Sequence, residues 1–172
     1  LALRGLVVFP GMLLHFDVGR EKSINALNLA MDKDQTIFLV SQKELKTENP
    51  NAEDLFRVGC VAKIRQIMRM SDDNIRVLIE GGYRASFSNL QTINNCLVAD
   101  VLELNEVKPT KKTANNEAFI RNLQELFAKY AKLIPKMPKD IVMSVMEAKN
   151  AAYLSDYIAS NIQMPLEAKQ MC

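Results

Sequence analysis

The hydrophobic pattern of the chain changes its period near residue 105, and this change constrains the fold more than any other feature. Before that point, short apolar segments alternate with polar residues and are separated by turn-forming residues, which is typical of β-strands. After it, apolar residues recur every three or four positions, which is typical of amphipathic helices. The sequence therefore predicts an α+β protein with a β-rich part at 1–105, a polar linker at 106–116 and an α-helical bundle at 117–172.

The first part holds at least six predicted strands and one helix. The strands are expected at 3–9, 13–18, 36–40, 58–70, 75–88 and 97–104, with turns at Pro10-Gly11 and 71–74 and a kink at Gly81-Gly82. The helix is expected at 20–32, where apolar residues have helical spacing and Glu21 favours the positive end of the helix dipole. This arrangement favours a small, curved, partly closed sheet.

The second part is predicted to be helical throughout. A stripe of apolar residues lies on the helix expected at 117–134, and we interpret it as the seam that packs the bundle against the sheet; its members are Phe119, Leu123, Leu126, Phe127, Tyr130 and Leu133. Helices at 139–149 and 150–161 are expected to follow, with Asn150 as a cap. Pro165 and Glu167 are typical of the start of a further helix, which we expect to be cut short at Cys172.

Composition excludes several classes of protein. The net charge of +2, from 22 basic and 20 acidic residues, makes neither nucleic acid nor an anionic membrane the expected partner. The three cysteines, Cys60, Cys96 and Cys172, form no C-x-x-C pair, which favours a reducing compartment. No segment has the length of a membrane span or the pattern of a signal peptide. Because the sequence begins at Leu1 and not at a methionine, we expect a longer parent protein.

No catalytic, cofactor-binding or metal-binding motif is found. The glycines form no phosphate-binding loop, and no nucleophile motif accompanies the single histidine, His15, which we interpret as a structural residue. Asp72-Asp73 is explained by turn chemistry. The sequence therefore predicts a binding or interaction domain and not an enzyme.

Two groups of residues are candidates for a substrate or partner surface. Met68 and Met70 flank a predicted hairpin tip, where soft methionine side chains could hold varied unfolded segments; the alternative is that they fill the core. Arg20, Glu21 and Lys22 begin the predicted helix, where the alternative is an ordinary solvated helix end.

Four short patches, in order and with sensible spacing, resemble the amino-terminal domain of bacterial ATP-dependent Lon proteases. The opening resembles L-P-L-R-x-x-V-x-F-P-x-M followed by V-G-R-x-x-S, with Ala2 where the family usually has proline. The other patches run from Asp54 to Ala62, from Val77 to Ala85 and from Leu154 to Ser160. The ending at Met171-Cys172 also departs from the family, whose helix normally continues with further apolar and acidic residues.

The resemblance implies a PUA-like, pseudo-barrel subdomain followed by a helical bundle. It further implies a cytoplasmic protein that binds unfolded or damaged proteins and assembles as a homohexamer. The ATPase module, with its ATP and magnesium, and the Ser-Lys protease module would lie downstream and outside these residues. Such a domain would itself hydrolyse neither ATP nor peptide.

Two other classes of function stay open from the sequence. A PUA-like fold also hosts RNA-binding domains, although the near-neutral charge and the lack of a basic strand face with interleaved aromatics argue against RNA. The domain could also be a stand-alone adaptor whose surface serves self-association.

Overall fold

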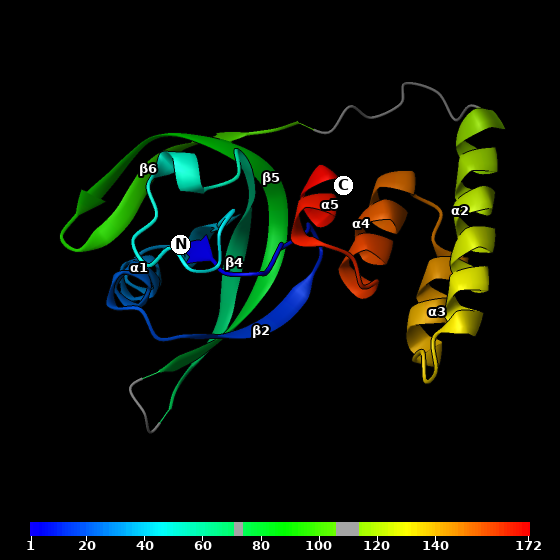
Figure 1. Cartoon of the computed structure of the whole chain (residues 1–172), viewed down its shortest axis with the longest axis horizontal. Coiled ribbons are helices and arrows are strands. Elements are labelled where there is room, and N and C mark those ends of the chain that lie inside the picture. Colours follow the sequence, from blue (N-terminus) through cyan, green and yellow to red (C-terminus); the bar gives the residue numbers. More distant parts are fainter. Residues whose placement is uncertain (71–73, 106–113) are drawn as a thin grey trace. The chain divides into compact units, whose positions relative to one another are not determined.

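The computed structural model describes residues 1–70, 74–105 and 114–172 (Figure 1). The chain divides into two compact units. The sheet unit comprises Leu1–Asn105 and Pro165–Met171, and the helical unit comprises Glu106–Met164 and Cys172. Residues 71–73 of the predicted turn and 106–113 of the predicted linker lie outside the described residues. The mixture of a strand-rich sheet with several helices confirms the predicted α+β class.

The strands of the sheet unit join in one sheet, in the order β1-β3-β4-β5-β2 with β6 also paired to β5. Their bounds in the described residues are β1 Ala2–Leu3, β2 Leu13–Val18, β3 Thr36–Ser41, β4 Val58–Arg69, β5 Ile75–Ile93 and β6 Cys96–Glu103. β1 pairs in parallel with β3, and the other pairs are antiparallel. The long strand β5 contacts β2, β4 and β6 and so connects most of the sheet.

β5 is interrupted at the glycine pair where the sequence predicts a kink. Val61 lies opposite Tyr83 and Ala62 lies opposite Gly81, so Gly82 has no residue facing it and forms a bulge. Gly81 also admits a close neighbour, because a Cβ there would lie 2.1 Å from the Phe9 carbonyl oxygen. The predicted kink is therefore confirmed.

The predicted strand at 3–9 is wrong for most of its length. β1 ends at Leu3, and Gly5 adopts a positive φ of 65°, which turns the backbone out of the extended conformation. Val7, Val8 and Phe9 are buried nonetheless. This apolar run is thus a core segment without strand pairing, which periodicity alone does not distinguish from a strand.

One α-helix, α1 (Glu21–Met31), contacts β3 and β6 within the sheet unit. Arg20 and Asp32 cap its two ends, so the predicted range of 20–32 is confirmed to within one residue at each end. The core beneath α1 is fully buried, and its largest members are Leu27, Leu39, Ile64, Val77 and Ile79. A short 3₁₀ helix, η1 (Ala52–Asp54), precedes β4.

The helical unit consists of α2 (Ala114–Leu133), α3 (Lys139–Glu147) and α4 (Ala151–Asn161). Its core is small: Phe127, Val145 and Leu154 are buried, and partly buried residues surround them. The Asn150 side chain accepts a hydrogen bond of 3.0 Å from the Tyr153 backbone N–H, which confirms the predicted cap.

The last helix, α5 (Leu166–Met171), belongs to the sheet unit. Gln170 Nε2 donates to the Val58 carbonyl at 2.8 Å. Pro165 precedes its first residue, as the sequence predicts.

Candidate functional site

Three neighbouring strands of the sheet unit present a mixed apolar and charged outer face. In register, Leu13 pairs with Glu80, His15 with Leu78 and Asp17 with Arg76, while Gln66 and Met68 of β4 lie opposite Leu78 and Arg76. Directly opposite residues in a sheet share a face, so these eight side chains form one surface, called the outer face below. The alternating residues Leu14, Phe16, Val77 and Ile79 contribute to the core on the other side.

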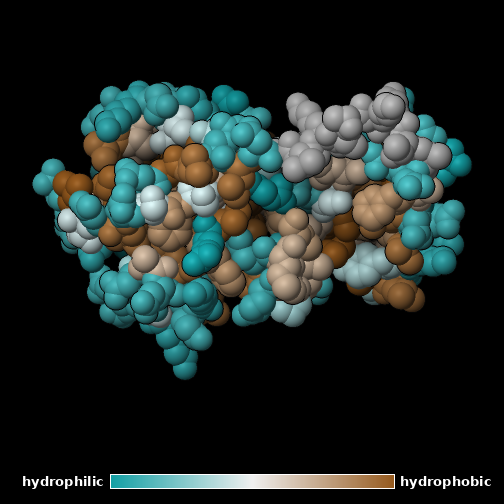
Figure 2. All heavy atoms as spheres, turned by 90° about the horizontal axis from the view of Figure 1, so that it is seen from above, coloured by the Kyte–Doolittle hydropathy of each residue, from teal (hydrophilic) through white to brown (hydrophobic). Residues whose placement is uncertain are grey.

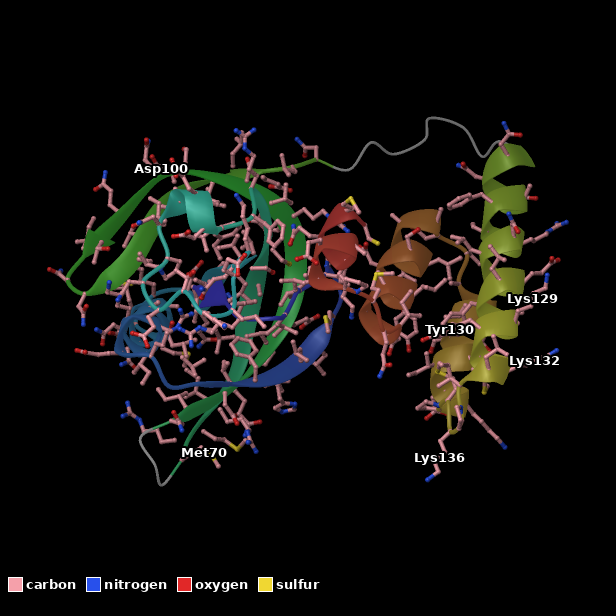
Figure 3. All side chains as sticks on the ribbon, viewed as in Figure 1. Met70, Asp100, Lys129, Tyr130, Lys132 and Lys136 are labelled. Carbon is pink, nitrogen blue, oxygen red and sulfur yellow. The ribbon has the colours of Figure 1, made fainter. Side chains whose placement is uncertain are left out.

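Met68 lies on the outer face, and Met70 lies just beyond the end of β4. Their exposed fractions are 39% and 40%, so the alternative that they fill the core does not describe them. The Met70 backbone N–H donates to the Asn74 carbonyl at 2.8 Å, which joins β4 to the residue before β5. Figure 3 shows where Met70 lies in the sheet unit. With Leu13, which is 63% exposed, the methionines supply adaptable apolar surface along these strands.

The charged side chains of the outer face pair with one another. Arg76 donates to both carboxylate oxygens of Asp17, at 2.7 and 2.8 Å, and Arg65 Nε donates to Glu80 at 2.6 Å. The hydrogen bond from Arg76 lowers the pKa of Asp17. These two ion pairs hold Arg76 and Arg65 across neighbouring strands, in the part of the outer face between Leu13 and Met68.

Arg20 holds a loop against the start of α1. Its guanidinium donates to Gln42 Oε1 at 2.7 Å and to the Ala2 carbonyl. Gln42 is fully buried and donates in turn to the Thr47 carbonyl at 2.8 Å. Partial burial, and then the nearby Arg4, lower the pKa of Arg20. The contacts of Arg20 therefore organise residues 42–48, a role that no sequence pattern indicated.

Glu21 and Lys22, the two residues that follow Arg20, differ in their contacts. Lys22 Nζ donates to Asn49 Oδ1 at 2.9 Å, so this lysine also contacts the loop after β3. Glu21 is exposed in the first turn of α1. The contacts of Arg20 and Lys22 run to this loop and to Ala2, whereas Met68 lies opposite Arg76 on the outer face. The five predicted surface residues thus belong to two groups.

A hollow of about 560 Å³ lies beside α1, β3, β5 and β6 in the sheet unit. Apolar side chains make up most of its lining, including Leu29, Phe38, Phe87, Leu97 and Val101. Sequence periodicity did not identify this hollow, because its lining comes from elements far apart in the sequence. Apolar residues also reach the surface in scattered groups elsewhere (Figure 2).

The apolar stripe of α2 splits into two rows. Leu123, Phe127 and Tyr130 join the core of the helical unit. Phe119, Leu126 and Leu133 are 50%, 53% and 79% exposed, so they lie outside that core. The seam between the bundle and the sheet stays a prediction. The stripe is wider than the surface that α3 and α4 cover.

The described residues offer no constellation for catalysis or metal binding. His15 is exposed on β2, and within the described ranges no three His, Cys, Asp or Glu side chains are grouped to hold a metal ion. Among the helices of these same ranges, none has the length and apolar character needed to cross a membrane.

Comparison with known proteins gives the family. The family model described as "ATP-dependent protease La (LON) substrate-binding domain" matches residues 1–171. The chain belongs to the Lon substrate-binding domain family. The resemblance found in the sequence is thereby confirmed, and residues 1–171 hold the substrate-binding domain and neither a protease nor an ATPase domain.

Two Lon proteases illustrate the relationship. The chain is 38% identical over 170 residues to "Lon protease" from Heliobacterium modesticaldum and 41% identical over 170 residues to "Lon protease" from Syntrophomonas wolfei subsp. wolfei. Each alignment covers 99% of this chain and 21% of the relative. The chain therefore spans about a fifth of the length of these curated Lon relatives.

Solved Lon structures share the fold. The structure described as "N terminal domain of Mycobacterium avium complex Lon protease" matches with a TM-score of 0.76 at 17% identity, covering 99% of this chain and 86% of that chain. A Lon N-terminal domain protein from Xanthomonas campestris matches with a TM-score of 0.55 at 11% identity, covering 95% and 96%. At these identities the likeness establishes the fold alone.

Proposed function

We propose that this domain captures unfolded or damaged polypeptides for degradation and that the outer face, with Met68 and Met70, provides the contact surface. The observation that carries the proposal is the exposure of both methionines at the end of β4, on the face that also carries the exposed Leu13 of β2. An unfolded chain offers apolar side chains in varied sequences, and flexible thioethers adapt to such partners better than branched side chains do.

The activities of the parent protein form part of the same proposal. Relatives called Lon protease are about five times longer than the matched region, which leaves room for an ATPase that uses ATP and magnesium and for a Ser-Lys protease. We place the parent in the cytoplasm as a homohexamer. Six weak capture sites in one assembly would bind a long unfolded chain far more tightly than one site, because linked sites raise the effective concentration.

The division of labour between the two units is proposed as well. In this view 1–105 forms a capture domain, 106–116 is a linker, and 117–172 includes the helices that serve assembly. The separate cores of the sheet unit and the helical unit support this division for 1–105 and for α2 to α4, whereas α5 belongs to the sheet unit.

A binding titration with matched variants tests the capture role. The probe is a fluorescently labelled protein kept unfolded by reduction and alkylation, and its folded parent is the first control. We expect the unfolded probe to bind and the folded parent not to bind. The Met68→Ser/Met70→Ser variant should weaken binding several-fold, while Met143→Ser/Met146→Ser, which alters two exposed methionines of α3, should bind as the unmodified chain does. Equal binding of folded and unfolded probes would refute capture.

The group at the start of α1 is the second candidate for the contact surface. Glu21→Ala with Lys22→Ala removes the side chains of the two residues that follow Arg20 and leaves the contacts of Arg20 itself in place. If this variant loses binding and the methionine variant does not, the contact surface lies at Arg20, Glu21 and Lys22 and not on the outer face.

A further inference from the structure

An exposed apolar row runs along one side of α2. Its members, Phe119, Leu126 and Leu133, are separated by seven residues each and are at least half exposed. Seven residues correspond to nearly two helical turns, so the row follows the helix axis for about 21 Å. The residues are called the α2 row below. Single exposed apolar residues are common, but three in line along one side of a helix form an apolar ridge on which a second helix can pack.

The α2 row is symmetric about its centre. Leu126 is seven residues from Phe119 and seven from Leu133. If a second α2 packs against the first in the opposite direction, Leu126 meets its own counterpart, and each Phe119 meets the Leu133 of the other copy. A two-fold interface requires such self-complementarity, since each contact must occur twice.

The charges beside the row favour the antiparallel direction. Glu125 and Lys129 are exposed, on either side of Leu126 in sequence. In an antiparallel pair, Glu125 of one copy lies near the level of Lys129 of the other, and the opposite charges meet. In a parallel two-fold pair this flank lies on opposite sides of the interface in the two copies, so Glu125 of one copy would not lie beside Lys129 of the other and the attraction would be lost. Lys132, further round the helix, points away from α3 and α4 (Figure 3).

We propose that the α2 row is a homodimer interface in which α2 packs antiparallel against α2 of a second copy, with Leu126 on the two-fold axis. The proposal rests on the self-association included in the proposed function and names the surface that carries it. One helix pair buries less area than the roughly 1,200–2,000 Å² of stable interfaces, so the dimer is expected to be weak and concentration-dependent.

Disulfide cross-linking of the whole 172-residue chain tests the geometry. The exposed Cys172 is first replaced by serine, while Cys60 and Cys96 are buried and stay. Under mild oxidation, Leu126→Cys should give a covalent dimer in high yield. Phe119→Cys alone should not, because its counterpart lies about 21 Å away, but Phe119→Cys with Leu133→Cys should. Met143→Cys, exposed on α3, measures the background of random collisions.

Sedimentation velocity over a range of concentrations provides the second measurement. Leu126→Asp should weaken dimerisation at least about tenfold, since it places two like charges on the axis. Glu125→Lys and Lys129→Glu should each weaken the dimer, and the double variant should restore it.

The outcomes separate this interface from the function on which it rests. A Leu126→Cys yield no higher than that of Met143→Cys, or efficient cross-linking of Phe119→Cys alone, overturns the antiparallel interface. If the chain still dimerises in sedimentation, self-association survives and only its location is wrong. If the chain is monomeric throughout, both the interface and the self-association fail. The capture role is measured separately by the binding of the unfolded probe.

Discussion

The sheet unit and the helical unit differ in how many of their apolar residues they bury. The sheet unit has a fully buried core built from residues far apart in the chain, and its exposed apolar residues include Leu13 and Met68 on the mixed outer face. The core cluster of the helical unit has three buried members, Phe127, Val145 and Leu154, while the α2 row and two methionines of α3 are exposed. The core of the helical unit therefore contributes less buried apolar surface to the stability of that unit. We therefore expect it to be the less stable unit and the one that gains from a second copy.

The largest effect is expected from the core of the helical unit. Leu154→Ala truncates one of the three buried apolar residues of its core cluster and should cost about 2–5 kcal/mol. Because so few buried residues remain, this unit should unfold at a lower denaturant concentration than the sheet unit. Circular dichroism would follow helix loss, and hydrogen exchange would locate it. Met143→Ala, on an exposed residue of α3 outside the α2 row, is the control and should be nearly neutral. One shared transition for both units would show that they are not independent.

The next effect concerns Arg20. Replacing it with methionine keeps the apolar stem but leaves buried Gln42 without its donor, which should cost about 1–3 kcal/mol. Urea unfolding measures this cost, and hydrogen exchange should show faster opening of residues 42–48. A change of the same size in α2–α4 would contradict the local role assigned to Arg20.

A similar effect is expected at Gln124, which links two helices of the helical unit. Its side-chain amide lies within hydrogen-bond distance of the Val145, Met146 and Ala148 carbonyls, at 3.1, 3.0 and 3.2 Å. Gln124→Leu leaves these carbonyls at the end of α3 without that donor and should cost about 1–2 kcal/mol. Thermal unfolding would detect the loss, and an unchanged melting temperature would show that water replaces the amide.

The smallest effect is a pH dependence of the outer face. Arg76 lowers the pKa of Asp17 in the folded protein, so the pair stabilises the fold at neutral pH. This contribution is lost as the pH falls through the range in which Asp17 becomes protonated. Because both side chains are about half exposed, solvent screening keeps the effect small. Urea unfolding at several pH values should show a slightly weaker dependence for Asp17→Asn, and a steeper one would contradict the assignment.

Local patterns predicted the elements well where one residue type forces the conformation. Gly19 and the apolar spacing after it set the start of α1, and Gly81-Gly82 marked the bulge in β5. Local patterns failed where tertiary packing decides the conformation or the exposure of a residue. The positive φ of Gly5 is not visible in an apolar run, and the exposure of Leu126 depends on how many helices cover α2. Met68 and Met70 were found by their place at a hairpin, but Leu13 needed the register of β2 against β5.

Nuclear magnetic resonance of the methionine methyl groups tests capture by the outer face most directly. The nine methionines occur in both units, so one labelling scheme reports on the outer face and on the helices at once. On addition of the unfolded probe, we predict that the Met68 and Met70 signals shift while those of Met143 and Met146 keep their positions. Shifts confined to Met143 and Met146, with Met68 and Met70 unchanged, would contradict capture by the outer face.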